Sequence, residues 1–242
     1  MARAPKRPAA PRPPTANASP NGKSARERVI EALMAWLAEK PFEEIGYADL
    51  AGRAGVSLAE LRDLFGSKLE ILAAQMKEVD RQVLAGGNGD GQNDMADEPP
   101  RERLFDVLMR RLDVLAPHKS ALRSLMRSAR RNPGLALALN RLGVRSQQWM
   151  LTAADISATG PKGVLRAQGL ALLFASVLRT WLDDEDPGLA RTMSALDRAL
   201  ARGQRLVGLL DEVARIPACV CRLRPRRRRR RDADDDTDTV AA

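Results

Sequence analysis

The chain has 242 residues, of which 44% are hydrophobic and only 3% are aromatic. Because Ala and Leu are abundant, this composition favours helices packed on helices over a β-sandwich. No apolar run approaches the roughly 18 residues that a membrane span needs, so a transmembrane protein is not expected. The Pro-, Ala- and Arg-rich residues 1–20 lack the apolar core of a secretory signal.

The formal net charge of +9 is unevenly distributed along the chain. Residues 1–23 contain five basic and no acidic side chains, and residues 99–131 contain nine basic and three acidic ones. Residues 24–80, in contrast, contain seven basic and eleven acidic side chains. The basic character therefore lies in the tails and one middle segment.

The cysteines and the single histidine argue against a metal or disulfide framework. Cys219 and Cys221 are too close together to staple a fold, so a reducing, cytoplasmic location is expected. His118 is the only histidine and has no Cys/His cluster around it, so neither a metal nor a cofactor is expected. No nucleophile arrangement, P-loop or GxGxxG sequence occurs, and the chain is not expected to be an enzyme.

The first predicted helix follows a basic arm, residues 1–23, that is expected to be disordered. Ser24 is placed as its N-cap, with Glu27 at the spacing of a capping box. Lys40-Pro41 ends this helix, because a residue before proline disfavours the α conformation.

Three shorter predicted helices follow, at 46–54, 58–64 and 68–84. Between the first two lies Gly55-Val56-Ser57, a tight turn in which Gly55 is free to take a positive φ and Ser57 is placed as the next N-cap. We define residues 24–85 as the headpiece. A polar, Gly-rich linker at 86–99 ends it.

Five helices are predicted beyond the linker, in a second domain that we place at 100–216. Asn132-Pro133 and Asp186-Pro187 each put an N-cap residue before a proline at the first helical position. The predicted helices are 100–116, 119–131, 133–154, 164–182 and 187–213. Residues 217–242, an arginine-rich run followed by an acidic one, are expected to be disordered.

The headpiece carries the pattern of a helix-turn-helix. Such a motif needs an apolar and a small residue on its first helix, a glycine at the turn, and apolar residues about one turn apart on its second helix. The residues that supply these are Leu50, Ala51, Ala54, Gly55, Val56, Leu61 and Phe65.

Over residues 26–76 the sequence resembles the TetR family of transcriptional regulators. The family's small-residue, Gly-Val-Ser turn appears as Ala54-Gly55-Val56-Ser57, and its Phe followed by a polar-Lys entry to the fourth helix appears as Phe65-Gly66-Ser67-Lys68. The resemblance implies an all-α homodimer that binds double-stranded DNA, with the third helix in the major groove. The implied DNA-binding residues are Arg53, Ser57, Leu58, Glu60, Arg62, Ser67 and Lys68.

The headpiece departs from the family pattern in two places. Ile45-Gly46 stands where the family usually has Thr or Ser, which caps the second helix and touches phosphate. On the third helix, Glu60 and Asp63 are acidic. Glu60 either accepts from a cytosine amino group or is repelled by phosphates. Phosphate neutralisation would fall to Arg53, Arg62, Lys68 and the basic arm.

The second half loosely resembles the TetR-like lipid-binding accessory protein of ubiquinone biosynthesis, through Trp149, Asp155, Asp183 and Leu196-Asp197-Arg198. An apolar stretch at 206–216 precedes the arginine run, a combination found at membrane surfaces. The same stretch is also expected of a segment that closes a dimer core.

Apolar residues of the second domain line either a pocket for a small apolar ligand or the ordinary core. The candidates are Phe105, Met109, Met126, Trp149, Phe174 and Trp181. His118 is expected to be structural or exposed, and the acidic run Asp183–Asp186 a solvated loop instead of a metal site.

The sequence therefore predicts an all-α fold with a helix-turn-helix headpiece and a C-terminal helical bundle for ligand binding and dimerisation. As a function it predicts a cytoplasmic, homodimeric, ligand-responsive DNA-binding regulator. The family resemblance implies that helices 164–182 and 187–205 pair across the dimer axis. The alternative keeps the fold without specific DNA binding, as a lipid- or isoprenoid-binding accessory protein at the membrane surface.

Overall fold

The computed structural model describes residues 22–87 and 98–220, with side chains described as far as residue 205. Every regular element within these ranges is a helix, as the composition predicts. The basic arm, most of the linker and the arginine-rich tail lie outside the described residues. So do the side chains of the stretch 206–216, on which the membrane-surface alternative depends.

The headpiece begins with the long helix α1, Ala25–Glu39, whose first turn is closed by the predicted capping box. Ser24 Oγ accepts from the backbone N–H of Glu27, and Ser24 N–H donates to the Glu27 carboxylate at 2.8 Å. A short 3₁₀ helix η1, Phe42–Glu44, leads to the paired helices α2, Tyr47–Ala54, and α3, Leu58–Leu64. The last headpiece helix is α4, Lys68–Ala85.

The α2–α3 turn depends on one glycine. Gly55 has φ +63°, the left-handed conformation in which a side chain is strained, and this confirms the prediction made for that position. Ser57 then caps α3 by accepting from the backbone N–H of Glu60 at 3.1 Å. Both local predictions follow from residue type alone, because the contacts involved span only a few residues.

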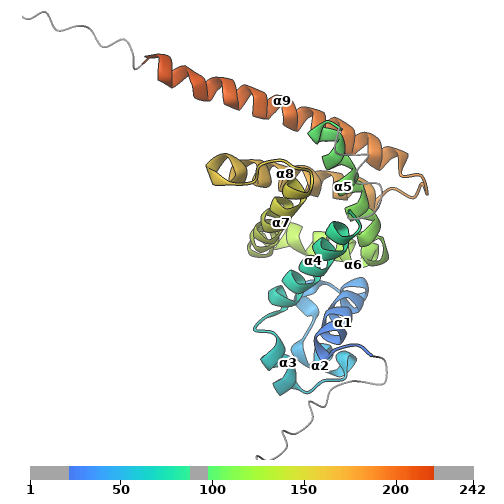
Figure 1. Ribbon diagram of the computed structural model, residues 1–242. Coiled ribbons are helices and arrows are strands. Elements are labelled where there is room, and N and C mark those ends of the chain that lie inside the picture. The colour runs from blue at the N-terminus through green and yellow to red at the C-terminus, as the bar shows by residue number, and fades with distance from the viewer. Residues whose placement is uncertain (1–21, 88–97, 221–242) are drawn as a thin grey trace, which may run out of the picture. The chain divides into compact units, whose positions relative to one another are not determined.

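The remaining helices follow the linker (Figure 1). Asn132 caps α7 as predicted, accepting from the backbone N–H of Leu135 at 3.0 Å. The helices are α5, Pro100–Leu115, the short η3, Ala116–His118, α6, Lys119–Arg131, α7, Pro133–Ala153, α8, Gly160–Leu182, and α9, Ala190–Val220. The described residues up to Gly203 belong to one compact unit, and a second unit begins at Gln204, within α9.

Two predicted helix starts are wrong. Helix α8 begins at Gly160, four residues before the predicted start, because Pro161 occupies its first turn and Thr159 its N-cap position. Helix α9 begins at Ala190, not at Pro187. Asp186 accepts from the backbone N–H groups of Gly188 and Ala190, which shapes Pro187-Gly188 into a turn before the helix.

The acidic run before α9 is not a fully solvated loop. Asp184 is only 1% exposed, and its carboxylate accepts from both the backbone N–H and the hydroxyl of Thr192, at 2.9 and 2.7 Å. The hydrogen bonds from Thr192 hold the pKa of Asp184 below its usual value. Asp184 is therefore a cap for the first turn of α9, reached across eight residues of chain.

Two hydrophobic clusters organise the described fold, and α4 contributes to both. The first joins α1–α4 of the headpiece to Ala121 and Leu125 of α6. The second gathers α5, α7, α8 and the start of α9 around Val79 and Val83, near the end of α4. In Figure 1, α4 runs from the headpiece past α6 and α7 towards α5. Movement of α4 would therefore change the packing of both clusters.

Helix α6 is also hydrogen-bonded to the segment between α1 and α2. Ser128 Oγ accepts from the backbone N–H of Phe42 at 3.2 Å and donates to the Glu43 carboxylate at 2.9 Å. Ser124 Oγ donates to the carbonyl of Lys40 at 3.3 Å. These contacts fix the back of the headpiece, which leaves α2 and α3 on its outer side.

Candidate nucleic-acid interface

Helix α3 has a solvent-exposed face that consists of a few residues. Leu61 is buried in the headpiece cluster together with Leu50 and Ala51 of α2, and the turn before it is closed by the Val56 N–H, which donates to the carbonyl of Ala51 at 3.1 Å. This orientation leaves Ala59, Arg62 and Asp63 exposed, together with Leu58, which is 57% exposed. The arrangement is that of a helix-turn-helix, in which the second helix offers its free face to the major groove.

The predicted residues of α3 lie in different environments. Arg62 is exposed, and its Nη1 donates to the carbonyl of Gly66 at 3.1 Å, which orients the guanidinium. The side chain of Glu60 is half-buried, and the backbone N–H of Glu60 donates to Ser57 Oγ. Leu58 and Arg62 lie one turn apart on the exposed face, so the structure brings these two predicted side chains together.

The start of α4 is capped but its lysine points into the protein. Ser67 Oγ accepts from the backbone N–H of Glu70 at 3.2 Å. Lys68 Nζ donates to the carbonyls of Phe42 and Ile45 at 2.9 and 2.8 Å and lies 4.6 Å from the centre of the Phe42 ring. Burial lowers the pKa of Lys68. Two of the three N–H groups of the ammonium are therefore used inside the protein, and only the third can donate to a phosphate.

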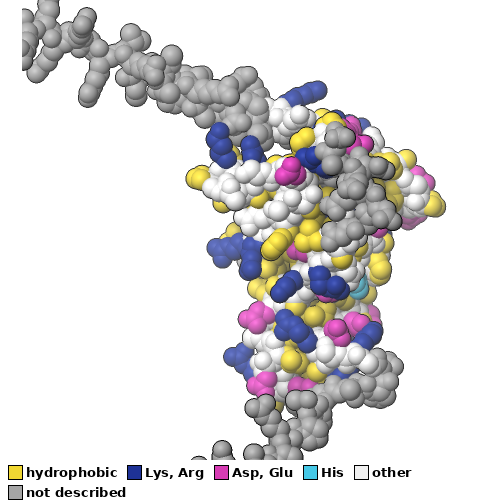
Figure 2. All heavy atoms as spheres, viewed as in Figure 1, with side chains coloured by type: hydrophobic (Ala, Val, Ile, Leu, Met, Phe, Trp, Pro, Cys, Tyr) yellow, Lys and Arg dark blue, Asp and Glu magenta, His cyan; other side chains and the backbone are white. Residues whose placement is uncertain are grey.

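Arg53 and Lys40 are held around a tryptophan. Their charged groups lie 4.4 and 4.3 Å from the centre of the Trp36 ring. Arg53 Nη2 also donates to Glu39 at 2.5 Å, and this hydrogen bond keeps the pKa of Glu39 below its usual value. On the face shown in Figure 2, acidic and basic side chains intermix over the headpiece. The headpiece itself therefore contributes little uncompensated positive charge.

The start of α2 lacks the Ser or Thr cap that is usual in the family, and Asp49 caps it instead. Gly46 N–H donates to the Asp49 carboxylate at 3.2 Å, and Lys40 Nζ binds the same carboxylate oxygen at 2.7 Å. The lysine hydrogen bond, followed by that from Gly46, lowers the pKa of Asp49. Asp49 therefore closes the first turn from inside the helix.

Two exposed headpiece residues were not singled out from the sequence. Tyr47, the first residue of α2, is 50% exposed. Arg26 of α1 reaches the far end of α3, with its guanidinium 4.4 Å from the centre of the Phe65 ring and Nη1 donating to the carbonyl of Leu64 at 3.4 Å. Tyr47 could have been noticed in the sequence because it is the single tyrosine of the chain. Nothing in the sequence distinguishes Arg26 from the other arginines.

The described residues match solved structures of transcriptional regulators. The TetR transcriptional regulator from Nitrosomonas europaea ATCC 19718 superposes with a TM-score of 0.58 at 22% identity, over 75% of this chain and 99% of that one. A TetR transcriptional regulator from Rhodococcus sp. RHA1 gives a TM-score of 0.51 at 23% identity, over 74% and 95% of the two chains. The chain has the TetR fold. No family model and no curated protein matches the sequence.

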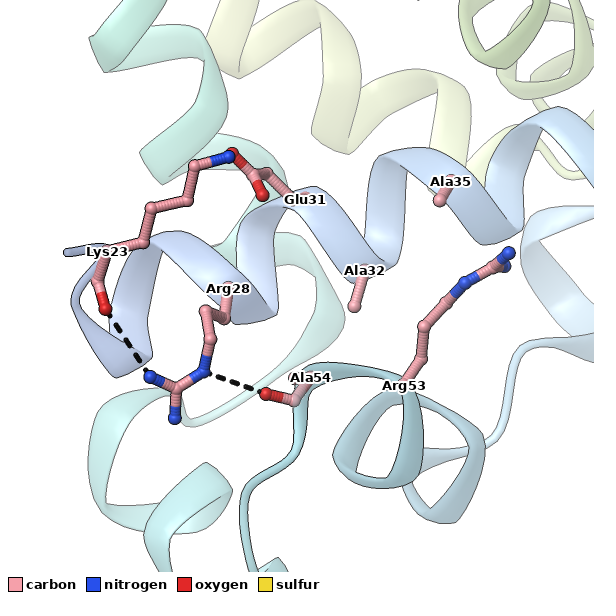
Figure 3. Close-up of a pocket in the computed structure, with 7 residues that line it drawn as sticks. All are labelled: Lys23, Arg28, Glu31, Ala32, Ala35, Arg53 and Ala54. Carbon is pink, nitrogen blue, oxygen red and sulfur yellow. Dashed lines mark hydrogen bonds and ion pairs between the residues drawn. The ribbon is translucent and has the colours of Figure 1, made fainter. Parts of the chain in front are cut away.

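Within this TetR fold, a surface hollow lies on the headpiece between α1 and the end of α2 (Figure 3). Its floor is formed by Ala32 and Ala35. Lys23 is paired with Glu31 at 2.6 Å across its rim, and Arg28 Nε donates to the carbonyl of Ala54 at 2.9 Å. Of these two contacts, the one from Arg28 fastens α1 to the end of α2 beside the hollow.

The predicted ligand-pocket residues divide into two groups. Phe174 and Trp181 are buried in the second cluster, and Phe105, Met109 and Met126 pack against it, partly buried. The structure brings these five onto one core. Trp149 does not join them, because it is 58% exposed on α7. Over the described residues, the helices are too short or too polar to span a bilayer.

A buried polar cluster that joins the last headpiece helix to the second domain was missed by sequence reasoning. Asp80 of α4 accepts from Arg111 Nη1 of α5 and from Ser146 Oγ of α7, both at 2.6 Å. Arg111 is only 3% exposed, and Nε of its guanidinium makes no hydrogen bond within the described chain. Charged residues inside amphipathic helices normally face solvent, so the sequence contained no sign of this cluster.

Proposed function

We propose that this chain is a DNA-binding transcriptional regulator that acts as a homodimer in the cytoplasm. The observation that carries the proposal is the exposed face of α3, which follows the glycine turn at Gly55 and lies between helix starts capped by Ser57 and Ser67. A fold alone does not define a function, so the proposal rests on this face and its side chains. Phosphate contacts would come mainly from the basic arm, because the headpiece cations are engaged.

The dimer is proposed to form through the exposed stripe of α8. Leu165 and Leu172 are 56% and 60% exposed and lie two turns apart, with Gly169 between them. A Cβ atom built on Gly169 would meet nothing within 4 Å, so the backbone there is open to a second helix. These three residues are uncharged, and an uncharged stripe of this kind suits a self-complementary two-fold interface. A second copy is therefore the occupant that we propose.

Ligand response is proposed to act through the second cluster. Phe105, Met109 and Phe174 supply apolar contacts there, and the same cluster contains the end of α4. Because α4 also packs in the headpiece cluster, a small apolar ligand that displaces it would change the separation of the two headpieces. Two headpieces on one face of the duplex should bind half-sites roughly 34–36 Å apart.

The proposal is tested by a salt titration of binding to genomic DNA fragments. Full-length protein is compared with versions that lack residues 1–21 or 221–242, and with Arg62→Ala. The matched control is Arg127→Ala, which removes the same charge from an exposed position of α6. We expect one fragment class to be retained by both truncated proteins, lost with Arg62→Ala and kept with Arg127→Ala.

The deletions also separate charge from recognition. Loss of the arm should weaken binding and flatten its dependence on salt, since fewer counterions are released, while sequence preference persists. Binding that ignores sequence and disappears with the tails would overturn the proposal and favour the lipid-binding alternative.

A further inference from the structure

We propose that α3 recognises a half-site containing a thymine and a guanine, with the thymine methyl group against Leu58 and Ala59 and the guanine edge against Arg62. The inference rests on the proposed function, since it needs α3 to enter the major groove. It goes further by specifying which base chemistry this face fits.

Leu58 is an exposed leucine at the first position of α3. The apolar contacts of the headpiece are made by Leu61 and, partly buried, Leu64, whereas Leu58 is 57% exposed. Ala59 is exposed beside it, so the first turn of α3 offers two neighbouring apolar side chains. The apolar group displayed by base pairs in the major groove is the C5 methyl of thymine. An apolar first turn therefore fits thymine better than any other base.

Arg62 lies one helical turn after Leu58 on the same exposed face. Its Nη1 donates to the carbonyl of Gly66, a contact that uses one of the five N–H groups of the guanidinium. The N–H groups that remain suit the two acceptors of guanine, O6 and N7, which arginine commonly binds as a pair. The Gly66 contact also limits the freedom of the side chain before DNA arrives.

The spacing of these side chains limits where the two bases lie. Four residues of α-helix rise about 6 Å, and successive base pairs are about 3.4 Å apart. Leu58 and Arg62 therefore reach bases about two steps apart. The thymine and guanine should accordingly fall within the same short stretch of each half-site.

Other bases lack a partner on α3. The sequence of α3, LAELRDL, contains neither Asn nor Gln, the side chains that bind adenine through two hydrogen bonds. Its two carboxylates are Glu60, which is half-buried, and Asp63, which is exposed near the end of the helix. Glu60 is half-buried and Asp63 lies beyond Arg62, farther from the first turn of α3, so the proposal assigns no cytosine contact to either carboxylate.

The test begins with selection of bound sequences from a random duplex library by the full-length protein. In the enriched site, each thymine is then replaced by deoxyuridine, which lacks only the methyl group, and each guanine by 7-deazaguanine, in which a C–H group replaces the acceptor N7. We expect one thymine whose replacement weakens binding about three- to fivefold, from loss of a buried methyl group. Replacing one guanine should weaken binding on the order of tenfold or more.

The variants assign each base to its side chain. With Leu58→Ala the deoxyuridine penalty should shrink to the part contributed by Ala59 while the 7-deazaguanine penalty persists, and with Arg62→Ala the 7-deazaguanine penalty should vanish while the deoxyuridine penalty persists. Arg127→Ala should preserve both penalties. Because Leu58 and Arg62 are exposed, melting temperatures are expected to stay unchanged, which separates lost recognition from lost folding.

The failure of this inference differs from the failure of the proposed function. An enriched motif without a thymine and a guanine two steps apart, or with penalties that ignore the variants, overturns the base assignment and leaves DNA binding established. Selection that enriches no sequence overturns both.

Discussion

Gly52 and Gly55 lie three residues apart in the α2–turn unit, but their backbones differ. Gly55 has φ +63°, whereas Gly52 is inside helix α2, and a Cβ atom at either position would meet nothing within 4 Å. The cost of a methyl group is therefore set by backbone conformation alone. We expect Gly55→Ala to destabilise the protein by about 1–2 kcal/mol, because left-handed backbone is unfavourable for alanine.

The matched control is Gly52→Ala. Alanine is a better helix former than glycine by about 0.8–1.0 kcal/mol, so this variant should be stabilised. Urea unfolding followed by circular dichroism measures both free energies. If the two substitutions changed stability in the same direction, the turn would not have the conformation described here.

The serine caps and the turn glycine of the headpiece, which are set by neighbouring residues, were predictable from sequence, whereas features set by distant residues were not. The caps at Ser24 and Ser57 and the positive φ at Gly55 follow from residue types within a few positions. Asp184, in contrast, takes its role from Thr192, on the next helix. The inward turn of Lys68 likewise depends on carbonyls of residues 42 and 45. No local pattern carries that information.

At the scale of elements, the Asp80–Arg111–Ser146 cluster joins α4, α5 and α7. Burial lowers the pKa of Arg111, and the Asp80 carboxylate opposes this effect. Removing one partner leaves a buried charge without compensation, which costs about 3–5 kcal/mol. We expect Arg111→Met to lose stability on that scale, as measured by the urea midpoint.

A double-mutant cycle provides the control. Asp80→Leu combined with Arg111→Met removes both charges, and Ser146 can then donate to a carbonyl of its own helix. The double variant should therefore be more stable than either single variant. Additive losses would mean that the ion pair does not couple α4 to α5.

The junction between α5 and α6 contains the only histidine of the chain, which makes its titration separable. Burial lowers the pKa of His118 below its usual 6.5, although Glu31 acts in the opposite direction. The unfolded chain therefore binds the proton more readily. Stability should be fully present above about pH 6.5 and decline as the pH falls through the lower pKa of the folded state.

Unfolding free energies between pH 7.5 and 5 measure this effect in the wild type and in His118→Gln. The difference between the two proteins should change with pH, since carboxylates titrate mainly below this range. A wild type that gained stability relative to the variant on acidification would show that the folded protein favours the protonated imidazole.

For the whole molecule, helix periodicity was sufficient to predict an all-α chain but not how its helices pack. The headpiece cluster includes Ala121 and Leu125 of α6, and the second cluster includes Val79 and Val83 of α4. Each of these residues looks like an ordinary apolar position on an amphipathic helix. Which cluster it joins is decided by contacts between elements distant in sequence. The candidate pocket shows the same limit: Trp149 has the residue type of a core position but lies on the surface.

The proposed dimer gives the last prediction at this scale. A carboxylate at Leu172 would be buried without a partner in a two-fold interface and would face its own copy, since two-fold contacts repeat the same surface. We expect Leu172→Glu to convert the protein to a monomer in sedimentation equilibrium, with little change in the melting temperature of the chain itself. Leu165→Glu should act in the same direction.

Leu137→Glu is the matched control. Leu137 is 54% exposed on α7, so the substitution makes the same chemical change outside the α8 stripe. It should leave the dimer intact. Monomeric Leu172→Glu should bind a full two-half-site duplex no more tightly than a single half-site, because the second headpiece no longer binds as part of the same molecule. A Leu172→Glu protein that stays dimeric would overturn the α8 interface, and a Leu137→Glu protein that dissociates would place the interface on α7.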